Sequence, residues 1–303
     1  MRGPVTTVRS GPGIQKPINR LLVVGDVMLD VVGHIGLPAT EACAAGHVAT
    51  DLGTRLGGTG LVVALEARKI NIPEVGLWGS VGCDPSQRLD PAGDAAVTIL
   101  ARERIHDLLR REERAPTGTA VCIDFKGEER LLLAQPGANQ LVDREGPSRT
   151  VLDFAQTSDA LFISGYSLID SARAEQVMTL VSAAKRNGAT IALDLVPHRL
   201  EDHVDNFERV LGEFDVIFGE AATIQRLYGV GPVPTSPNEL RELATRALRN
   251  KAMVVLRPSN EVELFVSRHD DLRWVNTGYE ALTPAERPGS LDRRSLRYLT
   301  GLQ

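Results

Sequence analysis

Residues 160–194, "ALFISGYSLIDSARAEQVMTLVSAAKRNGATIALD", carry the clearest structural pattern in this chain. Its two ends, 160–164 and 190–194, are short β-rich runs of the kind that is buried on both faces of a sheet. Between them, apolar residues repeat at the i, i+3, i+4 and i+7 spacing of one helix face: Val177, Leu180, Val181 and Ala184. This spacing predicts a helix from Asp170 to Gly188, which Gly188 is suited to end in the left-handed conformation.

Similar β-rich runs occur along the rest of the chain: "RLLVVG" at 20–25, "DVIF" at 215–218 and "MVVL" at 253–256. A second helix is predicted after Ser236, which forms a capping box with Glu239 and precedes Pro237 at the first helical position. Its apolar face consists of Leu240, Leu243, Ala244, Ala247 and Leu248. Strands that alternate with helices form right-handed crossovers, so the sequence predicts an α/β fold, a three-layer sandwich with a mostly parallel sheet.

Two segments break the alternation. The run "TAVCIDFKGEERLLLAQ" at 119–135 has two β-rich halves around the turn residues Lys126 and Gly127, which predicts a hairpin. A stretch without regular pattern, from Val31 to Arg55, leaves the first strand and returns at "LGGTG". Such excursions usually supply lids and substrate loops. We therefore expect a flexible leader over 1–18 and one domain over 19–303, with lid segments at about 31–56 and 118–135.

The composition favours a protein that acts on small molecules. The chain has 303 residues, 43% of them hydrophobic, and a net charge of −5, which allows one large core and gives no broad basic face for nucleic acid. Its apolar runs are far shorter than the roughly 20 residues of a membrane span. Three widely spaced cysteines are interpreted as packing residues in a reducing cytoplasm: Cys43, Cys83 and Cys122.

The turn after the first strand does not have the dinucleotide fingerprint. "LLVVGDVMLDVVG" offers a single glycine in the turn, Gly25, followed by Asp26 and Asp30, which disfavours a dinucleotide-dependent oxidoreductase. Further on, Gly57 and Gly58 open "GGTGLVVALEARKI", a glycine turn that runs into a helix. Bare backbone there could approach a ligand closely, and a purely structural turn is the alternative interpretation.

The last stretch, "ERPGSLDRRSLRYLTGL", predicts a helix that begins near Ser290. The unpaired N–H groups and the positive dipole end of such a helix can hold an anion, with Gly289, Ser290 and Leu291 as the anion hole. Asp292 would place a carboxylate beside it, able to take the proton of an attacking hydroxyl. The alternative is an ordinary acidic residue at a helix end.

Together these pieces resemble the ribokinase-like (PfkB) family of carbohydrate and nucleoside kinases, in order from about Arg20 to the end. "VVGDVMLD" resembles the family's opening strand, "LGGTGLVVALEARKI" its Gly-Gly signature and "GSVGCD" the strand and turn that follow. "PTGTAVCIDFKGEERLLLAQPGAN" resembles its lid hairpin and the segment after it. The terminal stretch lines up with the signature D-T-x-G-A-G-D and its helix.

The resemblance implies a ribokinase-like fold with a small β lid, and ATP-dependent phosphorylation of a hydroxyl on a sugar, nucleoside or related polyol. It implies ATP and Mg²⁺ as cofactors, Asp292 as the catalytic base, and a homodimer through the lid. The substrate-binding residues that it implies are Asp30, Gly57, Gly58 and Asn139. Glu220, which with Thr223 corresponds to the family's Asn-x-x-Glu motif, is the metal-binding candidate, although it could equally be an ordinary acid at a helix N-terminus.

Several positions depart from the family pattern, mostly on the nucleotide side. Leu291 replaces a signature glycine, Glu286 an aspartate, and Val62 the sugar-binding asparagine, which removes a donor and an acceptor. Leu256, Pro258 and Glu261 replace residues around the nucleotide, and the chain ends eleven residues after Asp292, where the family continues into helices that wall the adenine pocket. The alternative function is therefore a catalytically silent ligand-binding or regulatory protein.

Other polar residues have weaker claims. The six histidines are scattered, with no metal-ligand spacing. Asp194 and His198 follow a strand at the edge where open α/β sheets bind ligands. "RREER" at 110–114 is interpreted as a solvated helix end.

Overall fold

The computed structural model describes residues 17–45, 51–126, 130–142, 145–195, 204–228, 239–240, 242–243, 245, 253–257, 262–266, 272–276, 295–297 and 299–300. A nine-stranded sheet, in the order β15-β14-β13-β12-β11-β10-β1-β4-β6, forms its centre. The strands are β1 (Arg20–Val24), β4 (Glu74–Trp78), β6 (His106–Asp107), β10 (Ala160–Ser164), β11 (Thr190–Asp194), β12 (Val216–Glu220), β13 (Met253–Arg257), β14 (Val262–Val266) and β15 (Leu272–Asn276). Pairing is parallel from β6 to β13 and antiparallel for β14 and β15, which confirms the predicted mostly parallel sheet.

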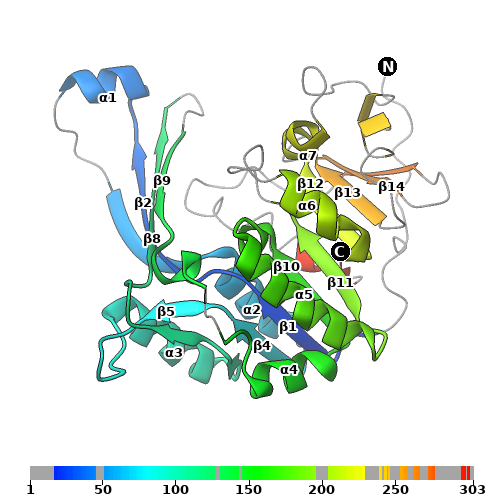
Figure 1. Cartoon of the computed structure of the whole chain (residues 1–303). Helices are drawn as coiled ribbons and strands as arrows, with labels where there is room; N and C mark the ends of the chain where they lie inside the picture. The colour runs from blue at the N-terminus through cyan, green and yellow to red at the C-terminus, as the bar shows by residue number, and fades with distance from the viewer. Residues whose placement is uncertain are drawn as a thin grey trace.

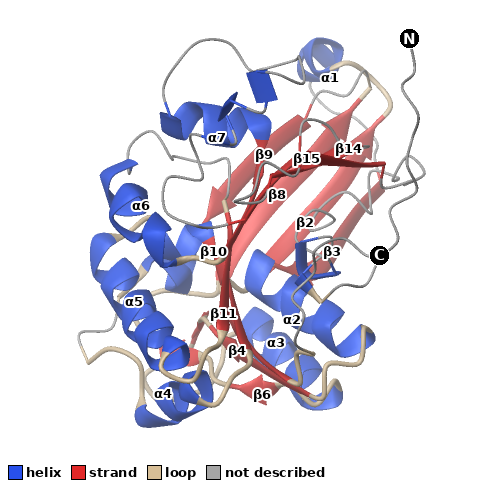
Figure 2. Ribbon diagram, turned by 90° about the vertical axis from the view of Figure 1, so that its right-hand side faces the viewer, coloured by secondary structure: helices blue, strands red, loops and turns tan. Residues whose placement is uncertain are grey.

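Helices cover both faces of this sheet, as Figure 2 shows. One face carries α2 (Thr59–Lys69) and α3 (Pro91–Arg102), and the other α4 (Arg149–Gln156), α5 (Ser171–Lys185), α6 (Val204–Val210) and α7 (Ala221–Tyr228). Successive residues of a strand point to opposite faces. Leu21 and Val23 of β1 accordingly join the cluster under α2 and α3, whereas Leu22 and Val24 join the cluster under α4 to α7. Burial on both sides explains the continuous apolar runs.

The stretch at 160–194 folds as predicted, into β10, α5 and β11. The side chain of Asp170 accepts a hydrogen bond from the backbone N–H of Arg173 and caps α5, and Gly188 takes the left-handed conformation at φ 71° after its end. For the helix predicted after Ser236, the structure describes Leu240 and Leu243, which are both helical and buried. Ser236, Pro237, Ala244, Ala247 and Leu248 lie outside the described residues.

A second, four-stranded sheet projects from the body of the molecule (Figure 1). Its order is β3-β2-β8-β9, with β2 (Met28–Ile35), β3 (Asp51–Gly57), β8 (Gly118–Phe125) and β9 (Arg130–Gln135); α1 (Ala39–Ala45) follows β2. The antiparallel pair β8 and β9 confirms the predicted hairpin. The expectation of an irregular stretch from Val31 to Arg55 is wrong, because β2 and β3 pair in a regular antiparallel ladder. Strand β2 is also stabilised by pairing with β8, far along the chain, and such pairing leaves no pattern in the local sequence.

Two further interpretations are corrected. Cys83 and Cys122 are buried, but Cys43 is exposed on α1 and does not pack. The run at 110–114 is no helix end, because Arg110–Glu112 forms strand β7, which pairs with β5 (Ser80–Gly82). Short 3-10 helices complete the described elements: η1 (Gly137–Gln140), η2 (Gly165–Leu168) and η3 (Leu211–Glu213). No helix among the described residues is long and apolar enough to cross a membrane.

Candidate functional site

The candidate site lies at the carboxyl edge of the central sheet, where the second sheet begins. β1 ends at Val24, and the turn from Gly25 to Val27 carries the chain into β2. Asp30 is therefore not the closing residue of the opening strand, as the resemblance implied, but the third residue of β2 in the second sheet. The same turn faces the beginning of α2, so two acidic residues and a helix N-terminus meet at one place.

Asp26 is held by the first turn of α2. Its Oδ2 accepts a hydrogen bond of 3.3 Å from the N–H of Thr59, and its backbone oxygen accepts one from Leu61. The other carboxylate oxygen, Oδ1, is buried and has no hydrogen-bond partner among the described atoms. Burial raises the pKa of Asp26 above its ordinary value, although hydrogen bonds from the backbone act in the opposite direction. A polar group in this state is suited to accept a hydrogen bond from a ligand.

Asp30 lies against Gly57. The two residues sit on adjacent strands, β2 and β3, and a Cβ at position 57 would lie 1.9 Å from Oδ2 of Asp30. Arg55 approaches the same oxygen, with its Nε at 3.7 Å. The predicted substrate residues Asp30 and Gly57 are thus brought together, and only glycine leaves room for the carboxylate in its present position.

Gly58 joins β3 to α2 and confirms the predicted glycine turn. It is the N-cap residue of α2, with φ 86° and no side-chain cap, a conformation that other residues seldom adopt. Behind it, Gly60 packs on Gly25, since a Cβ on Gly25 would lie 2.8 Å from Cα of Gly60. The glycines therefore let α2 approach the end of β1 backbone to backbone, and the N–H groups of Thr59 and Leu61 in its first turn bond to Asp26.

The side chain of Asn139 forms hydrogen bonds with the backbone of the turn between β1 and β2. Its Oδ1 accepts a hydrogen bond from the N–H of Val27, and its Nδ2 donates to the carbonyl of the same residue at 2.8 Å and to that of Pro136 at 3.1 Å. The carbonyl of Asn139 in turn accepts a bond of 2.6 Å from Nη1 of Arg173. The structure thus places Asn139 beside the site, where it fixes the turn that carries Asp26.

The end of the chain reaches this edge too. Ser295, Leu296, Arg297 and Leu299 are helical. The hydroxyl of Ser295 donates to Oδ2 of Asp194 at 3.0 Å, at the end of β11. Arg297 bonds to the buried Glu66 of α2, while Leu296 and Leu299 enter the core under that helix. Glu286, Pro288, Gly289, Ser290, Leu291 and Asp292 lie outside the described residues.

The nucleotide-side candidates are less gathered. Glu220 ends β12 and is partly exposed, and Thr223, one turn into α7, is buried with a hydroxyl that lacks a hydrogen-bond partner among the described atoms. Leu256 is buried in the core. Pro258, Glu261 and His198 lie outside the described residues. No group of three or more His, Cys, Asp or Glu in the described part of the chain is placed to hold a metal ion.

Sequence reasoning assigned no role to two residues of this edge. Asp26 was noted only because it interrupts a glycine pattern, and Ser164 ends β10 opposite Asp194 with a buried hydroxyl that finds no partner among the described atoms. A signal existed for both, because Ser164 is the last residue of a buried strand and Asp26 follows the end of another by two residues, at the edge where open α/β sheets bind ligands. What the sequence could not show is that their oxygen atoms are left without partners.

Comparison with known proteins identifies the family. The model of the pfkB family of carbohydrate kinases matches residues 19–276. The chain belongs to this family. Adenosine kinase from Anopheles gambiae, solved with a di(adenosine-5) tetraphosphate, superposes with a TM-score of 0.73 at 17% identity, over 93% of this chain and 88% of that chain.

Ribokinase from Arabidopsis thaliana, solved with ribose and ATP, gives a TM-score of 0.73 at 18% identity, over 94% of this chain and 87% of that chain. Adenosine kinase from Sinorhizobium meliloti gives 0.72 at 16%, over 93% and 87%. At these identities the likeness shows the fold. No curated protein matches the sequence at a significant level. The pfkB fold therefore brings Asp26, Asp30 and the glycine turn to one edge, which can orient hydroxyl groups by hydrogen bonds.

Proposed function

We propose that this protein transfers a phosphoryl group from ATP to a hydroxyl of a sugar, nucleoside or related polyol. The observation that carries the proposal is the occurrence of three contacts at the carboxyl edge of the sheet. Asp30 lies over Gly57, Asp26 accepts hydrogen bonds from the first turn of α2, and the final helix is bonded to Asp194 through Ser295. Phosphoryl transfer depends mainly on alignment and on stabilised charge, which such an edge can supply.

The acceptor would be held by Asp26 of the turn and Asp30 of β2. Carboxylate oxygens accept hydrogen bonds from hydroxyl groups, and Asp30 and the unpartnered oxygen of Asp26 offer such acceptors. Gly57 and Gly58 would let the acceptor lie close to backbone. Asn139 would act through the turn that it holds, because its amide group already bonds to Val27.

The reacting groups are assigned to the end of the chain. Asp292 would take the proton of the attacking hydroxyl, and the amides of Gly289, Ser290 and Leu291 would stabilise the charge of the transferring group. Asp292 is three positions before Ser295 in the sequence, a span of at most about 11 Å of chain. The bond from Ser295 to Asp194 therefore supports the assignment of Asp292 to this edge.

Glu220 is the residue proposed to hold Mg²⁺. This ion needs few protein ligands and keeps several of its waters, so one partly exposed carboxylate at the end of β12 fits it, whereas the buried hydroxyl of Thr223 is closed to a hydrated ion. When bound, Mg²⁺ would neutralise charge on the phosphates of ATP.

The second sheet is proposed to serve as a lid over the acceptor, formed by segments at about 31–56 and 118–135 of a domain over 19–303. Large apolar side chains remain exposed on it: Leu52, Leu131, Leu132 and Leu133. Exposed apolar surface of this kind marks contact sites, which supports a homodimer through the lid. A cytoplasmic location is also proposed, because none of the three cysteines, all of them described, forms a disulfide.

The test is a screen of sugars and nucleosides as phosphoryl acceptors, with ATP and Mg²⁺. Asp292→Asn should lower turnover by about 100-fold or more, because the hydroxyl loses its proton acceptor, while the unfolding transition stays in place. Asp94→Asn, an exposed residue on α3, is the matched control and should leave turnover unchanged. Equal turnover of the Asp292→Asn variant and the parent protein would remove Asp292 from the mechanism.

A catalytically silent ligand-binding protein is the second candidate, and Val62 favours it. Val62 lies in the first turn of α2, with its N–H bonded to the carbonyl of Gly58, and puts an isopropyl group where the family has a hydrogen-bonding amide. Calorimetric titration with ATP·Mg²⁺ separates the two candidates. Saturable binding supports the kinase, and the absence of binding supports the silent protein.

A further inference from the structure

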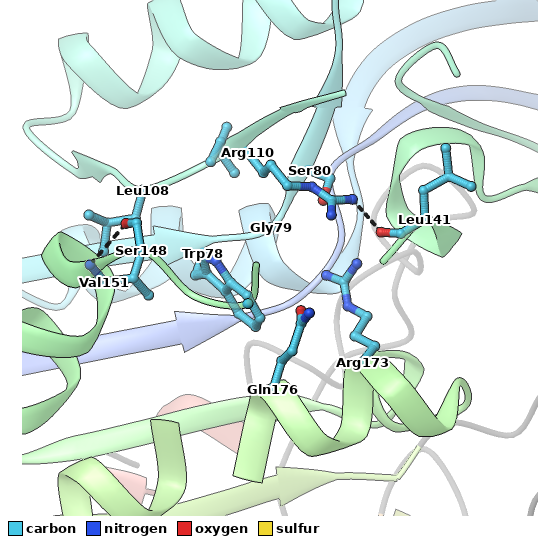
Figure 3. Close-up of a pocket in the computed structure, with 12 residues that line it drawn as sticks. Trp78, Gly79, Ser80, Leu108, Arg110, Leu141, Ser148, Val151, Arg173 and Gln176 are labelled. Carbon is cyan, nitrogen blue, oxygen red and sulfur yellow. Dashed lines mark hydrogen bonds between the residues drawn. The ribbon is translucent and has the colours of Figure 1, made fainter. Parts of the chain in front are cut away.

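A cavity of about 170 Å³ opens beside the first turns of α4 and α5 (Figure 3). It lies between the end of β4, strand β7 and the first turns of α4 and α5. Its walls include Trp78, Ser80, Arg110, Leu141, Arg173 and Gln176. None of Asp26, Asp30, Gly57 or Asn139 lines it, although Arg173 in its wall bonds to Asn139 and interacts with the charge of Asp26.

Arg173 is the central group of this cavity. It is only 6% exposed, and its Nη1 donates a bond of 2.6 Å to the carbonyl of Asn139. Its Nε is buried and has no hydrogen-bond partner among the described atoms. The guanidinium carbon lies 5.6 Å from the centre of the Trp78 ring. A buried cation with an unused donor is costly unless something binds it.

Arg110 brings a second positive charge to the same cavity. Its Nη2 donates to the carbonyl of Leu141, and Figure 3 shows its guanidinium and that of Arg173 converging on one space. Glu112 lies 3.3 Å from Arg110 but also accepts two bonds of 2.7 Å from Arg114, so its charge is shared. Burial, together with the charge of Arg110, lowers the pKa of Arg173 to about 10, although the charges of Asp26 and Asp170 act in the opposite direction.

The remaining walls limit what can bind. Trp78, Leu108, Leu141 and Val151 give the cavity an apolar side, and the side chain of Gln176 points toward Trp78 and Arg173 (Figure 3). The volume is below the roughly 300 Å³ at which pockets for larger ligands begin. Two guanidinium groups match the oxygens of a carboxylate or phosphate, and the indole offers a surface for a short hydrocarbon part.

We propose that this cavity binds a small organic anion, a short-chain carboxylate or phosphate ester, whose charged head lies between Arg110 and Arg173 and whose apolar part lies against Trp78. The site is joined to the candidate acceptor site, because Arg173 bonds to the backbone of Asn139 and the side chain of Asn139 bonds to Val27. An anion on Arg173 therefore acts on the residue that holds the turn of Asp26.

The test uses the fluorescence of Trp78 in the full chain. The protein has two tryptophans, so Trp274→Phe leaves Trp78 as the sole emitter. Butyrate and ethyl phosphate are titrated separately, without nucleotide, to distinguish a carboxylate from a phosphate ligand, and butyramide is the uncharged control. We expect a saturable change of emission at millimolar concentration with at least one anion and none with butyramide.

Variants in the same background place the response. Arg173→Met and Arg110→Gln should each weaken binding about tenfold or more, since each removes a charge-assisted bond. Arg149→Gln is the matched control, because Arg149 is 93% exposed on α4 and removes the same charge outside the cavity; it should change affinity by less than about twofold.

Circular dichroism checks that each variant is folded. Three outcomes would each overturn the proposal. The first is a response that Arg110→Gln leaves intact, the second is an equal loss of affinity with Arg149→Gln, and the third is no saturable response to either anion. Phosphate that binds only at the kinase site would leave the Trp78 emission unchanged and would count against it as well. The titration contains no ATP, so a failure of the proposed kinase activity does not alter these expectations.

Discussion

The two sheets of this molecule differ in how they are held. The strands of the central sheet are fully buried at residues such as Leu22 and Phe162, between two layers of helices. The second sheet leaves Leu52 62% exposed and Leu132 50% exposed, and relies on the ladders that join β2 to β3 and β8. Burial secures the central sheet, whereas the second sheet keeps side chains available for a ligand or a partner.

The largest expected effect lies in the central sheet. Phe162→Ala removes a ring that is fully buried and stacked 6.4 Å from the ring of Phe218, and should lower the free energy of unfolding by about 4 kcal/mol. Urea denaturation followed by far-UV circular dichroism measures the loss. A loss below about 1 kcal/mol would mean that burial in the central sheet does not dominate stability.

The second-largest effect is expected at a buried charged residue, Glu112. Glu112 is 5% exposed, and its bonds to Arg114 hold its pKa at about 2, below its ordinary value of 4.5. Because the pKa is lowered in the folded state, this stabilisation is complete above about pH 4.5 and is lost as the pH falls toward 2. Glu112→Gln should therefore cost about 2 kcal/mol at pH 7.

The pH series is the decisive measurement for Glu112. Unfolding free energies of the parent and of Glu112→Gln should converge between pH 4.5 and 2. Glu103→Gln, which alters a surface pair with Arg102, is the control and should cost less than about 0.5 kcal/mol at any pH. A constant difference across the range would assign the loss to packing and not to charge.

At the junction of the two sheets, we expect one substitution to lower turnover strongly and the free energy of unfolding only slightly. Gly57→Ala would push the carboxylate of Asp30 aside, because the new Cβ falls 1.9 Å from Oδ2. The side chain of Asp30 can rotate away, so we expect a loss of only about 1 kcal/mol in unfolding free energy. Acceptor turnover should nevertheless fall about tenfold or more.

Gly53 provides the control on the same strand. A Cβ there meets only Cγ2 of Val32, at 3.9 Å, so Gly53→Ala should leave unfolding and turnover close to those of the parent. If both alanine variants behave alike in the acceptor assay, the position of the Asp30 carboxylate does not matter for the activity.

The smallest effect on unfolding is expected in the second sheet. Leu52→Glu combined with Leu132→Glu changes two exposed side chains, and should alter the free energy of unfolding by less than about 0.5 kcal/mol. If this surface pairs two copies, sedimentation velocity should show the mass of the particle halved. A parent protein that sediments as a monomer would contradict the proposed homodimer.

The central sheet could be predicted from local sequence because strands that are buried on both faces have continuous apolar runs, as in 20–25 and 160–164, with amphipathic helices between them. The strands β2 and β3 could not. Residues 28–35 pair with 118–125, about 90 residues away, and their side chains are only partly buried, so no local alternation marks them. The run at 110–114 misled for the same reason, because β7 is stabilised by β5 and by buried ion pairs.

The candidate site was predictable in part. Asp30 and the glycine turn were found through the family pattern, and the structure brings Asp30 and Gly57 into contact. The role of Asn139 as a clamp on Val27, and the convergence of Arg110 with Arg173, depend on segments that lie far apart in sequence. The residues of each pair are not at the sequence spacing of neighbours on one helix or strand, so no periodic pattern predicts their contact.

Cys43 gives the molecule a natural handle. It is the one exposed thiol of the three in the chain, and it lies on α1 beyond β2, at the end of the second sheet, while Cys83 and Cys122 are buried in the fold. A maleimide dye would therefore attach to the unaltered protein at a single, known position. In the Trp274→Phe variant, energy transfer from Trp78 in the body to that dye would report, in real time, whether the distance between the body and the second sheet changes when an acceptor is added.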